Sequence, residues 1–294
     1  MISSLAAKLA ARKFVVTGEL TPPKGTDLSR LFATAELLRD CVDAINVTES
    51  PRARMTMDPR AVAKLLQDRG IETIVQVTSR DRNRIAIQSD LLGAAVLGLK
   101  NFVFMGGDST TGGDHPEAKP VFDLTASGLL AAAEALRNGR DHAGHPLLGT
   151  PDLFLGATCN PGAERFDAEI ENTRRKIDAG AKLLQTQAIY HGEPLRRFID
   201  VLKPDGVAIL AGVIPLKSEK SGPWLNANLP GIVVPPDMLQ LMDEAAKAGQ
   251  VSERGIELAA RVISEMKSIC QGVHVMAIGW ESAVPEILRT AGVR

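Results

Sequence analysis

The sequence predicts an α/β protein in which eight strand–helix units close into one (β/α)8, or TIM, barrel that spans residues 1–294. Short apolar runs alternate with longer amphipathic segments along the chain, which is the pattern of a parallel sheet with crossover helices. Eight units in 294 residues favour a closed barrel over an open sheet. Polar residues also follow the first four predicted strands at a regular interval, at positions 19, 48, 78 and 108. We expect a single domain.

Each strand is predicted where a short run of β-branched and other apolar residues is bounded by polar or turn residues. Aromatic residues make up only 4% of the chain, so Ala, Leu, Ile and Val must supply the core. The eight predicted strands are Lys13–Glu19, Val42–Thr48, Thr73–Thr78, Asn101–Met105, Leu153–Thr158, Lys182–Thr186, Val207–Val213 and Gly272–Ala277.

Helices are predicted where apolar residues recur at a helical period between these strands. They are Leu28–Leu38, Asp58–Gln67, Asn83–Leu97, Ala163–Ala179, Pro194–Leu202, Pro236–Lys247, Ser252–Ile269 and a last helix that ends near Leu288. Three stretches rich in glycine, proline or polar residues are expected to be irregular, namely Gly106–Pro120, Asn138–Thr150 and Pro215–Pro236. The extra helices after the seventh strand are expected to cover one barrel mouth.

The charge balance argues against nucleic acid or an anionic membrane as a partner. Lys and Arg number 34 and Asp and Glu number 35, which gives a net charge of −1. No apolar run is long enough to span a bilayer, and the N-terminal residues do not resemble a signal peptide. We therefore expect a cytoplasmic protein, and we expect it to form a homo-oligomer.

The spacing of the cysteines and histidines does not match a metal-binding motif. Cys41, Cys159 and Cys270 are scattered and include no CxxC pair, which also indicates a reducing compartment without disulfides. The five histidines lack acidic partners at ligand spacing, and His274 lies within a predicted strand, where a hydrogen-bonded position is the ordinary case. We predict no metal.

The active site of such a barrel lies at the carboxyl ends of the strands, because the loops that lead into the helices gather there. Glu19 stands at the first of these ends, and the following Pro22-Pro23 pair stiffens the exit of the strand. A carboxyl group in a partly apolar mouth is suited to act as a general acid. The alternative is a salt bridge from Glu19 to Lys24 or Arg80.

Asp108 follows the fourth strand within the sequence Met105-Gly106-Gly107-Asp108. The two glycines allow the backbone to approach a flat ligand closely, with the carboxylate projecting into the mouth. The alternative is an Asx turn with no ligand. The chain has neither a GxGxxG dinucleotide fingerprint nor a P-loop, so no motif supports a Rossmann or NTPase function.

The helix after the fifth strand carries Glu169, Asn172, Arg175 and Lys176, spaced i, i+3, i+6 and i+7. We expect these residues to share one helical face beside the mouth, where they would suit a diphosphate. The alternative is an ordinary solvated helix surface.

Five motifs together resemble the methylenetetrahydrofolate reductase family. The resemblance runs from Phe14 to about the last strand, and the motifs fall in order at successive strand ends. They are Thr17-Gly18-Glu19-Leu20-Thr21-Pro22-Pro23-Lys24-Gly25, Val77-Thr78-Ser79-Arg80-Asp81-Arg82-Asn83-Arg84, Gly106-Gly107-Asp108, the stretch from Arg174 to Ala181 with Gln185-Thr186-Gln187, and Gly212-Val213-Ile214-Pro215.

The resemblance implies a barrel that binds a flavin, normally FAD, and passes a hydride from it to 5,10-methylenetetrahydrofolate, giving 5-methyltetrahydrofolate. It implies that Glu19 protonates N10, so that the ring opens to an N5 iminium, and that Asp108 binds the pterin and stabilises the cation. Gln187 matches the substrate-binding glutamine. Five positions match flavin-binding residues, namely Thr48, Gly107, Asn172, Arg175 and Lys176.

Three further flavin-site positions depart from the family pattern. Gln76 stands where histidine is usual, Gly106 replaces an arginine, and Asn160 stands where tyrosine is common. These departures leave FAD, FMN or direct transfer from NAD(P)H open. The opening motif is more similar to a divergent branch found with one-carbon and corrinoid metabolism, in which some relatives work with a metal-carrying subunit. A redox partner protein is therefore also expected.

Two other functions stay open from the sequence. One is a folate-binding, flavin-poor subunit of a larger redox complex, which the three departures favour. The other is a barrel lyase or aldolase that forms a Schiff base through Lys182 or Lys217, although neither lysine has an apolar setting that would activate its amine.

Overall fold

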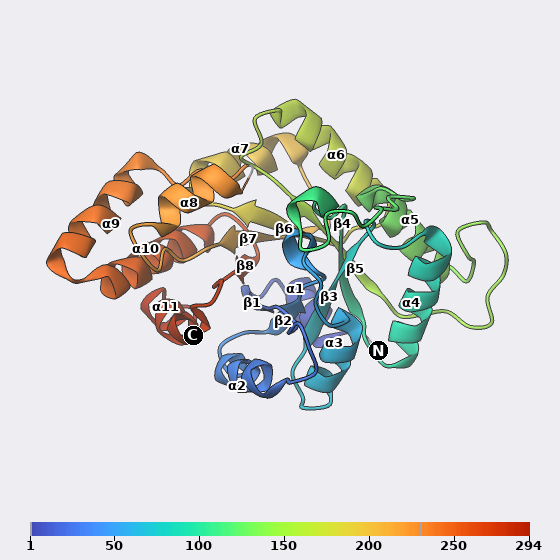
Figure 1. The fold of residues 1–294 in the computed structure, drawn as a ribbon. Coiled ribbons are helices and arrows are strands. Elements are labelled where there is room, and N and C mark those ends of the chain that lie inside the picture. Colours follow the sequence, from blue (N-terminus) through green and yellow to red (C-terminus); the bar gives the residue numbers. More distant parts are fainter. Residues whose placement is uncertain (1, 230) are drawn as a thin grey trace.

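Eight parallel strands pair in chain order and close into a barrel in the computed structural model, which describes residues 2–229 and 231–294 (Figure 1). Closure comes from β8 pairing with β1, with Thr17 opposite His274. The fold prediction is confirmed, and every predicted strand boundary lies within two residues of the observed one. The strands are β1 (Val15–Leu20), β2 (Ala44–Val47), β3 (Thr73–Thr78), β4 (Asn101–Met105), β5 (Phe154–Cys159), β6 (Leu183–Ala188), β7 (Ala208–Val213) and β8 (Gly272–Val275).

Helices surround the barrel, and three of them follow β7, where they extend to one side of the molecule (Figure 1). The α-helices are α1 (Ser4–Ala10), α2 (Ser29–Leu38), α3 (Pro59–Gln67), α4 (Arg84–Val96), α5 (Ala126–Arg137), α6 (Phe166–Asp178), α7 (Gly192–Leu202), α8 (Ser221–Asn228), α9 (Pro236–Ala248), α10 (Val251–Met266) and α11 (Val284–Thr290). The short 3₁₀ helices are η1 (Pro51–Ala53), η2 (Thr110–Gly112) and η3 (Glu281–Ala283).

Apart from α1, which precedes the first strand, two helices were not among those predicted. Helix α5 follows the Gly-rich loop after β4, where the Thr125 hydroxyl accepts from the Gly128 N–H and begins the helix. Helix α8 lies inside Pro215–Pro236, which we expected to be irregular. The sequence of this helix has little helical periodicity, and tertiary contacts stabilise it instead. The Leu225 side chain is buried, and the Asn226 side chain bonds both the N–H and the carbonyl of Val234.

The amino-terminal end of the barrel is closed by α1. The Ser3 hydroxyl accepts from the Ala6 N–H and caps the helix, and Leu5 and Leu9 are buried. The two leucines form one apolar cluster with residues of the barrel interior, namely Val15, Ala44, Ile74, Val103, Leu183 and Leu210. This end of the barrel is therefore a packed core, which leaves the opposite mouth for chemistry.

Between the strands and the outer helices lies a second, larger aliphatic core. Its largest fully buried members include Phe102, Phe104 and Phe198, so the few aromatic residues are placed where volume is needed. Among the described residues, no helix combines the length and apolar character needed to cross a bilayer. Cys41, Cys159 and Cys270 are all unpaired thiols.

Removing most of the Leu5 side chain should destabilise the barrel. Because Leu5 has no exposed surface beneath the strands, Leu5→Ala should lower the free energy of unfolding by about 2–5 kcal/mol. Leu148→Ala removes the same atoms from a fully exposed loop and should change it by less than about 0.5 kcal/mol. Urea denaturation measures both, and equal losses would show that α1 does not seal the core.

Candidate active site

The barrel interior changes from apolar to polar on the way to the carboxyl-end mouth. Asn46 on β2 and Gln185 on β6 are both buried and come from opposite sides of the barrel. They exchange two hydrogen bonds across it, with Asn46 Nδ2 donating to Gln185 Oε1 at 2.7 Å and Gln185 Nε2 donating to Asn46 Oδ1 at 3.2 Å. Buried amides are stable only when paired in this way, so this contact closes the lumen below the mouth.

Glu19 lies above this layer, and its carboxylate is held from two sides. Gln76 Nε2 donates to Glu19 Oε2 at 3.2 Å, and His274 Nε2 lies 3.3 Å from the same oxygen. The Glu19 side chain is 21% exposed, whereas that of His274 is 4% exposed. The expected alternative, a salt bridge from Glu19 to Lys24 or Arg80, is not formed, because Lys24 pairs with Asp114 and Arg80 pairs with Asp81.

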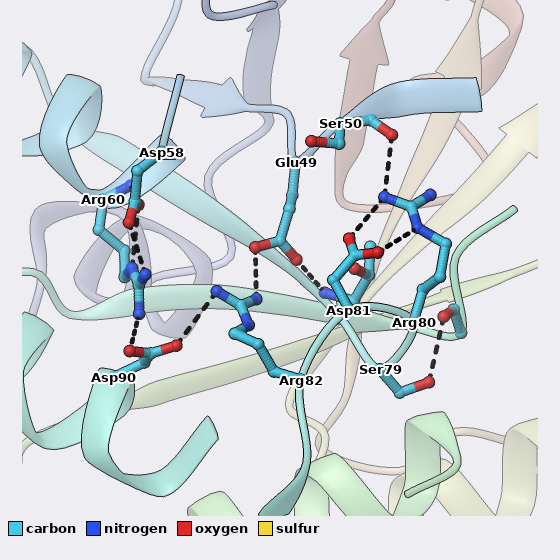
Figure 2. A network of polar contacts seen from close by, with 11 residues as sticks. Glu49, Ser50, Asp58, Arg60, Ser79, Arg80, Asp81, Arg82 and Asp90 are labelled. Carbon is cyan, nitrogen blue, oxygen red and sulfur yellow. Dashed lines mark hydrogen bonds and ion pairs between the residues drawn. The ribbon is translucent and has the colours of Figure 1, made fainter. Parts of the chain in front are cut away.

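A charge network around the buried Glu49 fixes the ends of β2 and β3 (Figure 2). Glu49 accepts from the Thr78 N–H and from the Arg82 guanidinium, and its side chain is only 7% exposed. Arg82 also reaches Asp90 on α4, which pairs with Arg60 on α3. The sequence analysis missed Glu49, because its partners are distant in the chain.

Arg80 connects three loops of the mouth. Its guanidinium donates to Asp81 at 2.7 Å and to the Ser50 carbonyl at 3.2 Å (Figure 2). It also donates to the Asp108 carbonyl at 3.5 Å. The Arg80 side chain is 3% exposed, so these are interior contacts that hold the loops after β2 and β4 against the loop after β3.

Asp108 lies exposed in the loop after β4, and its Oδ2 accepts from the Arg52 backbone N–H at 2.8 Å. The bonded segment is strained, since Ser50, Arg52 and Ala53 all have positive φ angles of 39°, 57° and 53°. The Asp108 carboxylate thus stabilises an unusual backbone that borders the mouth. Glu19 and Asp108 have separate hydrogen-bond partners.

Asp114 joins the loops after β1, β2 and β4. It accepts from Lys24 Nζ at 2.5 Å and from the Met55 N–H at 3.0 Å, and these two bonds lower the pKa of Asp114 to about 2. Because folding lowers the pKa of Asp114, its two contacts stabilise the fold fully above the ordinary pKa of Asp. This stabilisation is lost as the pH falls toward 2. At neutral pH the three loops are therefore held together.

The predicted diphosphate face on α6 is only partly formed. The amide of Asn172 donates to Glu169 at 3.1 Å, and the buried Lys176 donates to the Thr158 carbonyl at 2.7 Å. Arg175 is exposed and lies 3.7 Å from Glu171, so the expectation that all four residues share one face is wrong. On a helix of 3.6 residues per turn, i+6 lies about 120° around from i and about 100° from i+7, outside the stripe that i, i+3 and i+7 share.

The other residues predicted to contact a flavin also have partners within the protein. Thr48 donates to Thr21, and Ser79 donates to the carbonyl of Gly106. Asn160 Oδ1 accepts from the Gly162 N–H, and its backbone N–H donates to Glu169. With the Lys176 amine bonded to a carbonyl and the Glu169 carboxylate at the centre of this group, the residues as arranged do not fit a flavin diphosphate.

Gln187 on β6 is half-buried, and its Oε1 accepts from the Ala188 N–H at 3.1 Å. It belongs to the same carboxyl-end mouth but not to the hydrogen bonds around Glu19. Of the two candidate Schiff-base lysines, Lys217 donates to the Ile278 carbonyl at 2.7 Å. Lys182 precedes β6 and lines a groove at the opposite end of the barrel. Lys182 therefore lies away from the mouth, and the Lys217 amine is held by a backbone carbonyl, so neither favours the lyase alternative.

A cavity of about 400 Å³ opens beside the mouth, between the segments that follow β7 and β8. Its walls include Ile214, Pro215 and Ile278, and Trp224 from α8 lines it with 41% of its surface exposed. The guanidinium carbon of Arg52 lies 5.3 Å from the centre of the Trp224 ring. An apolar cavity with nearby cations suits a ligand that is both aromatic and anionic.

Comparisons with known proteins decide the family. The model of the family described as methylenetetrahydrofolate reductase matches residues 4–292. This chain belongs to that family. A probable methylenetetrahydrofolate reductase (NADPH) of Caenorhabditis elegans is 23% identical over 82% of this chain and 35% of its own length. The Escherichia coli 5,10-methylenetetrahydrofolate reductase is 23% identical over 78% of this chain and 73% of its own length.

The eukaryotic relatives are longer than this chain. The chain spans 35% of the C. elegans protein and 38% of methylenetetrahydrofolate reductase 1 of Schizosaccharomyces pombe. Among solved structures, an uncharacterized Clostridium thermocellum protein that binds two copies of 5-methyl-5,6,7,8-tetrahydrofolic acid superposes with a TM-score of 0.67. It is 18% identical and covers 99% of this chain and 100% of its own, which shows the shared fold.

Gly107 and Gly106 provide a matched pair for testing the Asp108 loop. Gly107 has a φ of +92°, and an added Cβ would lie 3.1 Å from Thr78 Cβ and 3.2 Å from Arg80 Cβ. Gly107→Ala should therefore lower the free energy of unfolding by about 1–3 kcal/mol. Gly106→Ala, where the added carbon meets open space, should cost less than about 1 kcal/mol. Thermal unfolding compares the two, and equal losses would contradict the described loop conformation.

Proposed function

We propose that this protein binds a reduced folate at the carboxyl-end mouth and transfers a hydride between the methylene and methyl levels of its one-carbon group. The reaction is the reduction of 5,10-methylenetetrahydrofolate to 5-methyltetrahydrofolate, or the reverse oxidation. The observation that carries the proposal is Glu19, a partly exposed carboxyl group held at the mouth by Gln76 and His274. Membership in the family and the methyltetrahydrofolate bound by the C. thermocellum protein support the choice of substrate.

In the proposed reaction, protonated Glu19 gives its proton to N10 of the substrate. The bond between N10 and the methylene carbon breaks, its electron pair stays on N10, and a cationic N5 iminium forms. A hydride then adds to the methylene carbon and gives the methyl group. The negative charge of Asp108 at the same mouth would stabilise the cation, and Gln187 would bind the pterin through its amide.

The cavity beside Trp224 would hold the tail of the folate. A p-aminobenzoyl-glutamate tail combines an aromatic ring with carboxylates, which matches an apolar cavity lined by Trp224 and bordered by Arg52, Lys217 and Lys220. In this orientation the pterin would lie toward Glu19 and the tail would leave the mouth on the side of β7 and β8.

The hydride donor would be a reduced flavin, FAD as the family resemblance implies or FMN, or NAD(P)H acting directly. The internal contacts of Asn172 and Lys176 weigh against tight binding of a diphosphate. A folate-binding, flavin-poor subunit that works with a redox partner is the second candidate, and the same two contacts favour it.

Glu19→Gln tests the assigned acid. The amide keeps the size of the side chain but has no acidic proton, so kcat for methylenetetrahydrofolate reduction should fall by about 10²- to 10⁴-fold. Binding of 5-methyltetrahydrofolate, measured by calorimetry, should persist.

Glu117→Gln is the matched control, because Glu117 is exposed in the loop after β4. It should leave the turnover rate unchanged. Near-wild-type turnover by Glu19→Gln would show that Glu19 is not the acid. If the wild-type protein binds folate but shows no turnover with either flavin or NAD(P)H, the result would favour the subunit alternative.

The visible absorption spectrum of the purified protein tests the choice of donor. Because the Lys176 amine is bonded to the Thr158 carbonyl, we expect the protein to be isolated without a stoichiometric flavin and to bind added FAD only weakly. Stoichiometric FAD that survives dialysis would contradict this expectation and would require Lys176 to change its partner.

A further inference from the structure

We propose that His274 is a positioning residue for Glu19, and that Thr17 selects the tautomer in which His274 donates to the Glu19 carboxylate. The proposal deepens the function proposed above and rests on it for its catalytic consequence. Its structural part, the tautomer of His274, stands independently. No sequence pattern connects His274 with Glu19, because 255 positions separate the two residues.

The barrel closure places the three residues together. Thr17 and Glu19 are two positions apart on β1, so their side chains point to the same face of the strand. His274 pairs with Thr17 across the β1–β8 junction. His274 Nδ1 lies 3.0 Å from Thr17 Oγ1, and His274 Nε2 lies 3.3 Å from Glu19 Oε2. Both ring nitrogens therefore have a defined partner.

The chemistry of the partners selects one proton arrangement. A neutral imidazole has one N–H and one bare nitrogen, and a threonine hydroxyl is able to serve either. A carboxylate only accepts hydrogen bonds. With Glu19 ionised, His274 must carry its proton on Nε2 and donate it to Glu19, and the Thr17 hydroxyl then donates to the bare Nδ1. Thr17 is fully buried, so water does not compete for this bond.

This arrangement gives the two carboxylate oxygens different roles. Oε2 accepts from both Gln76 and His274, which leaves Oε1 to carry the transferable proton toward the folate. When Oε1 gives its proton to N10, the negative charge that remains on Glu19 is stabilised by two donors that are already in place. His274 acts on Glu19 through this hydrogen bond and does not pass a proton to the folate.

The surroundings of His274 hold its ring in one orientation. Glu19 is the ionisable side chain in contact with it among the described residues, and Thr17 on β1 is neutral. On the other side, β7 presents Gly212 opposite His274. The ring is 3% exposed.

The kinetic test uses His274→Leu, His274→Gln and, as the control, His115→Gln in an exposed loop. His274→Leu removes the donor to Oε2, so kcat should fall by about 10- to 100-fold, and the pH at which kcat is half-maximal should move upward. His274→Gln offers an amide N–H in place of Nε2–H and should recover part of the rate and most of the pH profile. His115→Gln should change neither.

The structural test reads the tautomer directly by ¹⁵N NMR of histidine-labelled protein, with His274→Gln used to assign the signal. The wild type should show His274 as the neutral Nε2–H tautomer, and Thr17→Val, which lacks the hydroxyl, should shift the signal toward a tautomer mixture. An Nδ1–H tautomer in the wild type would overturn the proposal. The proposal would also be overturned if His274→Leu kept the wild-type rate and pH profile while Glu19→Gln was inactive. That result would not contradict the proposed function. An inactive wild type would instead count against the proposed function and leave the tautomer result intact.

Discussion

The pairing of buried polar side chains inside the barrel is the constraint on which the rest of this structure depends. Below the mouth the polar side chains are buried, and a buried polar group is stable mainly when it has a partner within the protein. Asn46 and Gln185 satisfy each other across the full width of the barrel. Above them, Gln76 and His274 hold the Glu19 carboxylate, and Thr17 bonds the other ring nitrogen of His274. Glu19 is partly exposed at the mouth. The same pairing that keeps the interior stable therefore fixes the position of the proposed acid.

The two ends of the barrel differ in role: apolar packing at the amino-terminal end stabilises the fold, and the carboxyl end carries the proposed site. At the amino-terminal end, Leu5 and Leu9 of α1 fill the lumen with apolar volume. At the carboxyl end, the loops are held by charged contacts of Arg80, Glu49 and Asp114, and some of their backbone is strained. Strain of this kind persists only where surrounding contacts compensate for it, and it concentrates at functional sites. Asp108 supplies one such contact through the Arg52 N–H.

The regular alternation of short apolar runs and amphipathic segments was sufficient to predict the barrel, because each unit of a parallel sheet has its own local pattern. The positions of Glu19 and Asp108 at the mouth followed from the same pattern. Helix α8 was not predicted, because it depends on contacts with Val234 and on burial of Leu225 and not on its own periodicity. His274 was expected to be hydrogen-bonded, but its partner Glu19 was not foreseen, since only the closure of β8 on β1 brings them together. The roles of the proposed site residues remain predictions.

A crystal structure with bound 5-methyltetrahydrofolate tests the central claim most directly. The account predicts that the pterin lies at the carboxyl-end mouth, with N10 within about 3 Å of Glu19 Oε1 and the p-aminobenzoyl ring beside Trp224. A folate bound with its pterin away from Glu19, or bound in the groove that Lys182 lines at the other end of the barrel, would contradict it.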